Sequence, residues 1–163
     1  MDAEPTDATV EDIERLYRSR YQRFLRLALA VVGSREAAAD VVQEAFARAL
    51  RSRADFRAQG SLESWVWRIV MNVARTRRQA PPQLLGQPAD ADAADGQPST
   101  WPELRAAVAA LPERQRQALF LRHYADLSYE EIGDILGMAR GTVSATLHAA
   151  HGSLRRTLEA VTT

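Results

Sequence analysis

The sequence predicts an all-α protein made of two small helical domains joined by a flexible linker. Apolar residues recur at i, i+3, i+4 spacing on both sides of the chain's centre, which indicates amphipathic helices. No stretch alternates between apolar and polar residues as a strand does. Residues 81–102 hold five of the seven Pro and show no sustained periodicity, as is typical of a linker. We therefore place a first domain at 10–80, a linker at 81–100 and a second domain at 101–159.

The first domain begins with residues 10–32, which read as one or two helices ended by Gly33. Ser34 can cap a second helix, because its hydroxyl can accept a hydrogen bond from the first turn. The apolar residues of that second helix follow the rhythm of one buried face: Ala38, Val41, Val42, Ala45, Phe46, Ala49 and Leu50. The opposite, polar face presents Asp40, Gln43, Glu44 and Arg48.

A third helix is expected after Ser61, which can cap it. The predicted core stripe consists of Leu62, Trp65, Val66, Ile69, Val70 and Val73. On this interpretation Trp65 packs in the core and Trp67 lies nearer the polar face. The exposed side carries Arg68, Asn72 and Arg75, and Arg77 and Arg78 follow.

The second domain opens with a short amphipathic helix at 101–111, and Pro112 can occupy the first turn of the next helix. Ser128 and Glu131 form the sequence pattern of a capping box. Gly137 stands where a tight turn needs a residue that tolerates positive φ. The inner face of a last helix is formed by Val143, Leu147, Ala150 and Leu154. Residues 127–150 therefore predict a helix-turn-helix.

Charge is segregated along the chain although the formal net charge is zero. Residues 1–14 carry −6, 15–78 carry +9, 79–110 carry −3 and 111–163 are neutral. All 21 basic residues are Arg, which we attribute to codon bias, although Arg suits phosphate and guanine contacts. A basic first domain indicates an anionic partner such as nucleic acid.

Several classes of protein are disfavoured. The chain has no Cys, so disulfides and thiolate metal sites are excluded. Its three His lack partners at metal-ligand spacing, and we interpret His148 and His151, three residues apart, as polar surface. No nucleophile–base set or Gly-rich phosphate loop occurs, so no enzyme activity, metal or cofactor is expected. No apolar run approaches a membrane span and no leader opens the chain, so we expect a cytoplasmic protein.

Two segments resemble bacterial RNA polymerase sigma factors. LPERQRQALFLRHYADLSYEEIGDILGMARGTVSATL resembles their C-terminal DNA-binding region 4, and DVVQEAFARAL followed by GSLESWVWRIVMNVARTRR resembles their region 2. The ordered pair with one linker is similar to the extracytoplasmic function (ECF) subfamily of the sigma-70 family, over about residues 10–158. The resemblance implies a factor that binds core RNA polymerase and directs promoter-specific transcription initiation, without chemistry of its own.

The resemblance also implies roles for region 2. The polar face of the second helix would meet the β′ coiled coil of polymerase, through Asp40, Gln43, Glu44 and Arg48. A merely solvated helix surface is the alternative. The third helix and the loop before it would melt and read the minus-ten element, through Phe56, Arg68, Asn72, Arg75, Arg77 and Arg78. The residue types fit, because Asn can bond a base edge, Arg can hold phosphates, and Phe56 could wall a pocket for a flipped base.

Region 4 would bind the minus-thirty-five element while docking on the β flap. The groove-facing or backbone-facing residues would be Arg140, Thr142, Ser144, Ala145, Thr146, His148 and Arg155. The chain departs from the family pattern here, because Ser144, Ala145 and Thr146 replace a common Arg-Ser-Arg and Ala149 replaces a further Arg. Ala139 also stands where a Ser cap is frequent. We expect base contacts through methyl groups, hydroxyls and His148.

Alternatives stay open at this point. The acidic linker would thread toward the RNA exit path, or serve only as a solubilising tether. Many relatives are held inactive by an anti-sigma factor, a partner of which this sequence carries no mark. A stand-alone helix-turn-helix regulator is the rival interpretation, and it predicts specific duplex binding without polymerase. A purely structural scaffold leaves the 14 Arg of residues 15–78 unexplained.

Overall fold

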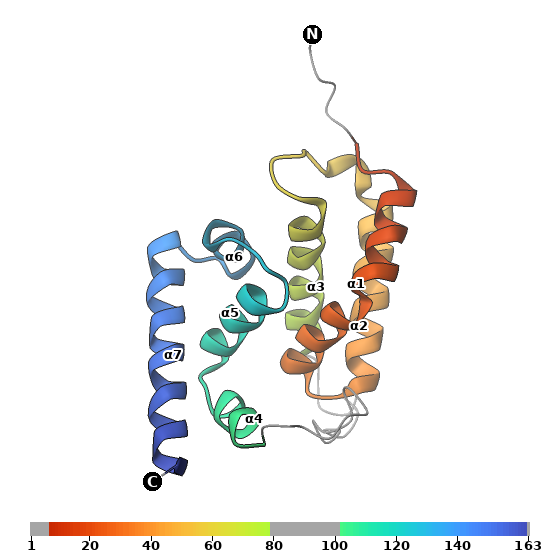
Figure 1. The fold of residues 1–163 in the computed structure, drawn as a ribbon. Helices are drawn as coiled ribbons and strands as arrows, with labels where there is room; N and C mark the ends of the chain where they lie inside the picture. Colours follow the sequence, from red (N-terminus) through yellow and green to blue (C-terminus); the bar gives the residue numbers. More distant parts are fainter. Residues whose placement is uncertain (1–6, 79–101, 163) are drawn as a thin grey trace. The chain divides into compact units, whose positions relative to one another are not determined.

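The computed structural model describes residues 7–78 and 102–162, which fall into two compact units (Figure 1). The first unit holds α1 (Val10–Val32), α2 (Arg35–Arg51), the 3-10 turn η1 (Arg53–Asp55) and α3 (Leu62–Arg78). The second holds α4 (Pro102–Ala109), α5 (Glu113–His123), α6 (Tyr129–Leu136) and α7 (Arg140–Thr162). No strand occurs in these described ranges, which confirms the all-α prediction. The predicted linker lies outside them, and the predicted domain limits stay predictions.

Local capping accounts for the helix ends of the first unit. Thr9 and Asp12 form a capping box at the start of α1, which sequence inspection did not anticipate. α1 runs unbroken to Gly33, whose φ of 81° lies in the left-handed region favoured by glycine. Ser34 accepts a hydrogen bond from the Ala37 amide at the start of α2, as predicted. Ser61 likewise accepts from the Ser64 amide at 3.0 Å, which confirms the predicted cap of α3.

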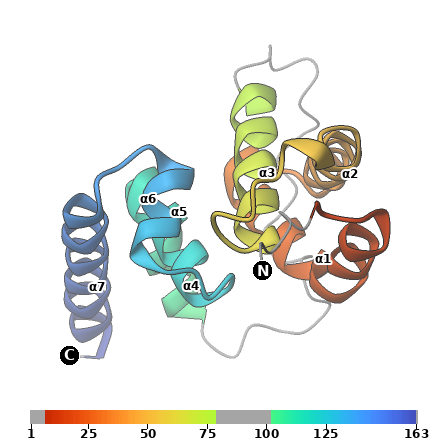
Figure 2. The same cartoon turned by 90° about the horizontal axis from the view of Figure 1, so that it is seen from above.

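The first unit is a three-helix bundle around an aromatic core. α1, α2 and α3 each pack against the other two, and Figure 2 shows the three helices around their shared interior. Phe24 of α1 lies at the centre, with its ring centroid 4.1 Å from that of Trp67 and 5.1 Å from that of Phe46. Tyr17 meets Phe46 edge-on at 5.0 Å. Aromatic pairs at these distances add to the free energy of burial.

The expected positions of the two Trp side chains in this unit were wrong. Trp67 is 1% exposed and fully in the core, whereas Trp65 is half-buried and lies 5.6 Å from Phe56. The buried residues of α3 are Val66, Trp67, Val70, Met71, Val73 and Ala74. At ~100° per residue, this face is turned by about a quarter turn from the stripe inferred from sequence. Trp67, Val70, Met71 and Ala74 also follow i, i+3, i+4, i+7 spacing, so the sequence held two overlapping stripes.

The second unit contains the predicted helix-turn-helix. The side chains of Ser128 and Glu131 complete their capping box, with distances of 3.2 and 2.8 Å to each other's backbone amides. Gly137 ends α6 with a φ of 67°, as predicted. Gly133 was not singled out from sequence, yet a Cβ there would lie 2.5 Å from the Met138 carbonyl oxygen. The turn between α6 and α7 therefore requires glycine at position 133.

Buried residues from three helices hold α7 in place. The largest of them are Leu121, Ile132, Leu136 and Leu147. Val143, Leu147 and Ala150 form the buried side of α7, as predicted, whereas Leu154, predicted with them, is half-buried. Arg114 closes the C-terminal end of α6, because its guanidinium donates to the Leu136 carbonyl at 2.8 Å. The opposite side of α7 is thereby presented to solvent.

Candidate nucleic-acid interface

The polar face of α2 lies on the surface, but its charged groups are paired. Asp40, Gln43 and Arg48 are exposed and Glu44 is half-buried. The Glu44 carboxylate accepts from Arg48 at 2.7 Å and lies 3.6 Å from Arg51. The hydrogen bond from Arg48 and the charges of the two Arg lower the pKa of Glu44. This face therefore presents an ordered pattern of paired charges.

An ion pair connects this face to the end of α3. The Arg77 guanidinium donates to the Asp40 carboxylate at 2.8 Å, and the two side chains are 35% and 48% exposed. Sequence reasoning had assigned Asp40 to polymerase and Arg77 to DNA phosphates. The structure places the two side chains together, so the Arg77 guanidinium is engaged by a carboxylate of α2.

Asn72 lies on the exposed side of α3, as sequence reasoning expected. Arg68 precedes it by one turn, and both side chains face solvent. Arg75 is half-buried. The Asn72 backbone carbonyl accepts from the Thr76 hydroxyl, while no residue in the described ranges bonds to the side-chain amide of Asn72. α3 thus presents one side-chain amide among Arg side chains on its exposed side.

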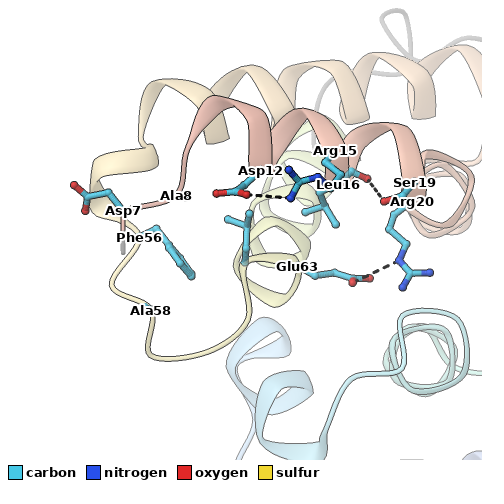
Figure 3. Close-up of a pocket in the computed structure, with 11 residues that line it drawn as sticks. Asp7, Ala8, Asp12, Arg15, Leu16, Ser19, Arg20, Phe56, Ala58 and Glu63 are labelled. Carbon is cyan, nitrogen blue, oxygen red and sulfur yellow. Dashed lines mark hydrogen bonds and ion pairs between the residues drawn. The ribbon is translucent and has the colours of Figure 1, made fainter. Parts of the chain in front are cut away.

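A solvent-open hollow of about 450 Å³ lies where the loop before α3 meets α1. Figure 3 shows residues of α1 and of the loop lining it from different sides. Phe56 and Leu62 supply apolar surface and Arg15 supplies a guanidinium, while the Ser19 hydroxyl donates to the Leu16 carbonyl at 3.3 Å. The remaining lining residues are Asp7, Ala8, Asp12, Leu16, Arg20, Ala58 and Glu63. Sequence reasoning found Phe56 but not the α1 residues, because they are about 40 positions away in the chain.

The loop beside this hollow has an unusual backbone conformation. Ala58 has a φ of 53°, in the left-handed region that a side chain disfavours. Such positions collect at sites that bind ligands. Across the hollow, Glu63 lies 3.6 Å from the Arg20 guanidinium and accepts from the Trp67 indole at 3.4 Å. The start of α3 is therefore tied to α1 while the loop itself is exposed.

The outward face of α7 is nearly neutral. Six exposed residues in its first three turns are neither acidic nor Arg: Gly141, Thr142, Ser144, Ala145, His148 and Ala149. Arg140 is exposed as the first residue of the helix, and Arg155 is exposed about two turns before its C-terminal end. Thr146 is half-buried and its hydroxyl donates to the Thr142 carbonyl at 2.7 Å, which leaves it less free for a base.

Two His side chains meet on the second unit. The Nε2 atoms of His123, at the end of α5, and His151, in α7, are 3.2 Å apart. Burial, followed by the charges of His151 and Arg122, lowers the pKa of His123. Sequence reasoning had considered His148 with His151. The structure instead joins His151 to a residue 28 positions earlier.

Neither a larger metal-ligand cluster nor a membrane helix is found in the part of the chain that the structure describes. Residues 7–78 and 102–162 contain no group of three or more His, Asp or Glu side chains placed to hold a metal ion. None of their helices combines the length and the apolar character needed to cross a membrane.

Comparison with known proteins identifies both units. The family model for sigma-70 region 2 matches residues 16–80, and that for sigma-70 region 4 matches residues 102–151. The sigma factor RpoE of Bartonella quintana, solved in complex with the anti-sigma factor NepR, has a similar fold. The two structures superpose with a TM-score of 0.74 at 21% sequence identity. The similarity covers 92% of this chain and 98% of the Bartonella quintana chain.

Curated relatives extend the similarity over most of the chain. The ECF sigma factor SigE of Mycolicibacterium smegmatis is 33% identical over 167 residues, covering 95% of this chain, which spans 65% of that relative. The sigma-H factor of Pseudomonas aeruginosa is 31% identical over 160 residues, covering 86% of this chain and 83% of the relative. The chain therefore belongs to the ECF sigma factors of the sigma-70 family, whose members give RNA polymerase its promoter specificity.

Proposed function

We propose that the chain acts in initiation through three surfaces: α2 on core polymerase, α3 and the hollow on the melted minus-ten strand, and α7 on the minus-thirty-five duplex. The observation that carries this proposal is the exposed side of α3, where Arg68 and Asn72 lie one turn apart, on the helix whose first turn lines a hollow with an aromatic wall. Single-stranded DNA is held by cations on its phosphates and by apolar surfaces on its bases.

The polymerase surface follows from the charge pattern of α2. Asp40, Gln43, Glu44 and Arg48 would meet the β′ coiled coil, and the second unit would dock on the β flap. The Glu44–Arg48 pair at 2.7 Å keeps both side chains in one geometry, which lowers the entropy lost on binding. An anti-sigma protein is a further proposed partner, since the Bartonella quintana factor was solved with one.

The hollow would receive an extruded base of the minus-ten element. Phe56 would stack on one face, the Arg15 guanidinium would offer donors to its edge or phosphate, and the Ser19 hydroxyl, which donates to Leu16, would serve as an acceptor. Asn72 would contact a neighbouring base, and Arg68, Arg75 and Arg78 the phosphates. Arg77 would contribute less while its guanidinium is held by Asp40.

Region 4 would supply a weaker contact with the duplex. Thr142, Ser144, Ala145 and His148 would approach bases, with Arg140 and Arg155 on phosphates. Methyl and hydroxyl groups suit contacts with A·T base pairs better than contacts with guanine, which is usually bound by Arg. The factor would perform no catalysis and would work in the cytoplasm, where polymerase and promoter are found.

Run-off transcription with purified core polymerase and a promoter library tests this proposal. We expect initiation from a subset of promoters only when the factor is present. Asn72→Ala should reduce selection at one minus-ten position by about 1–3 kcal/mol, the worth of a good base contact. Thr76→Ala, one turn along the same exposed side, is the matched control and should change nothing.

Two results would contradict the proposal. If the factor supports initiation from no promoter in the library, the sigma role is refuted. If Asn72→Ala reduces transcription equally at all promoter sequences, the base contact is refuted. A gel shift without polymerase tests the rival interpretation, a stand-alone regulator. That regulator would bind a specific duplex tightly without polymerase, whereas the neutral face of α7 predicts weak binding alone.

A further inference from the structure

His123 and His151 bring two imidazole nitrogens to one point on the surface of the second unit. His123 is the last residue of α5 and His151 lies near the middle of α7. Their Nε2 atoms are 3.2 Å apart, and their ring centroids are 5.5 Å apart with the planes at 73°. Both side chains are exposed, so ions in solution can reach them.

We propose that these two side chains chelate one divalent transition-metal ion, of the kind represented by Zn²⁺ or Ni²⁺. Zinc binds imidazole nitrogen at 2.0–2.1 Å, so two ligands at a tetrahedral angle lie about 3.3 Å apart. The 3.2 Å between the Nε2 atoms is close to that spacing. Imidazole is a preferred ligand of zinc, copper and nickel, whereas Mg²⁺ and Ca²⁺ require oxygen ligands.

The surroundings define the strength of this site. The cationic Arg122 side chain is the neighbour that opposes a bound cation, although its guanidinium is turned toward Tyr129, 5.6 Å from the ring centroid, and donates to the Leu127 carbonyl. Within the described ranges the structure places no third His, Asp or Glu with the pair, so water would complete the coordination. The site therefore has open positions and a moderate affinity.

A bound ion would fasten the end of α5 to α7. The two helices already pack against each other, and the pair joins positions 28 residues apart. A ligand that binds only the folded state stabilises it by mass action. The metal would thus stabilise the unit that carries the helix-turn-helix, independently of the roles proposed above for promoter DNA.

Metal binding is measured on the full, untagged chain after treatment with a chelator. Isothermal titration with ZnCl₂ and with NiCl₂ should show one site, and thermal unfolding should shift upward with either ion but not with MgCl₂. His123→Ala and His151→Ala should each weaken binding by about tenfold or more, because metal affinity depends on every ligand. His148→Ala is the matched control, since His148 is exposed on α7 one turn away, and it should bind as the parent does.

Three outcomes would overturn the proposal. They are the absence of binding in the parent chain, unchanged binding in the variant lacking both His123 and His151, and a loss in His148→Ala equal to that in His151→Ala. In case an Ala variant unfolds, His123→Gln and His151→Gln keep the side-chain size, and far-ultraviolet circular dichroism verifies their helices. A folded Gln variant that retains full zinc affinity also counts against the site.

Discussion

α3 and α7 are both helices with one buried and one exposed side, but their exposed sides differ in charge. α3 exposes Arg68 and Arg78 as well as Asn72, whereas the early turns of α7 expose mainly Thr, Ser, Ala and Gly. Cations give affinity for phosphate whatever the base sequence, while hydroxyls and methyls discriminate bases with little affinity. This difference suggests a division of labour in the proposed function. The first unit would supply most of the affinity for DNA, and the second would mainly set the position of the protein on the promoter. Joint attachment through polymerase would then combine them.

The largest expected effect concerns the buried residues that hold α3 in the first unit. Trp67→Ala should lower the free energy of unfolding of the first unit by about 3–5 kcal/mol, because it removes a fully buried indole against Phe24. Trp65→Ala is the matched control and should cost clearly less, since Trp65 is only half-buried. Urea unfolding followed by circular dichroism measures both. Equal losses would mean that Trp67 does not anchor α3.

The position of α7 in the second unit depends on the turn between α6 and α7. Gly133→Ala should destabilise the second unit by about 1–3 kcal/mol, because the new Cβ would lie 2.5 Å from the Met138 carbonyl oxygen. Gly141→Ala is the control, since a Cβ there meets nothing within 4 Å. Thermal unfolding of the two variants makes the comparison. If both unfold at the same temperature, the turn does not determine how α7 is presented.

A side-chain cap introduced at the start of α7 should stabilise that helix. The Ala139 carbonyl accepts the first bond of that helix, from the Val143 amide at 3.0 Å, but Ala139 has no side-chain acceptor. Ala139→Ser should therefore stabilise the second unit by about 1 kcal/mol. Denaturant midpoints of parent and variant measure the gain. A destabilised variant would show that a hydroxyl cannot cap this helix start.

The smallest expected effect tests the link between the polymerase face and α3. In a double-mutant cycle of Asp40→Asn and Arg77→Gln, the coupling free energy between the two side chains should be about 0.2–1 kcal/mol of unfolding free energy. The value is small because both side chains are partly exposed. Asp40→Asn should also release Arg77 and slightly raise affinity for single-stranded DNA at low salt. Fluorescence anisotropy with a labelled oligonucleotide measures that change. Additive single effects would indicate that the two faces are independent.

The sequence by itself determined the features that depend on neighbours three or four positions away. Ser34, Ser61 and the Ser128–Glu131 box were predicted as caps, and Gly137 as a left-handed helix end, because their partners lie within one turn. The buried faces of α2 and α7 were also largely predicted, since each has one clear apolar stripe. The helix-turn-helix follows from these local signals.

Only the tertiary structure decided how each helix is turned about its own axis and which distant side chains meet. α3 has two overlapping apolar stripes, and packing against Phe24 selected the one that buries Trp67. The hollow at Phe56, the Asp40–Arg77 ion pair and the His123–His151 pair join residues 28 or more positions apart. Periodicity is blind to such contacts, because it describes one helix at a time while the packing of several helices fixes their faces.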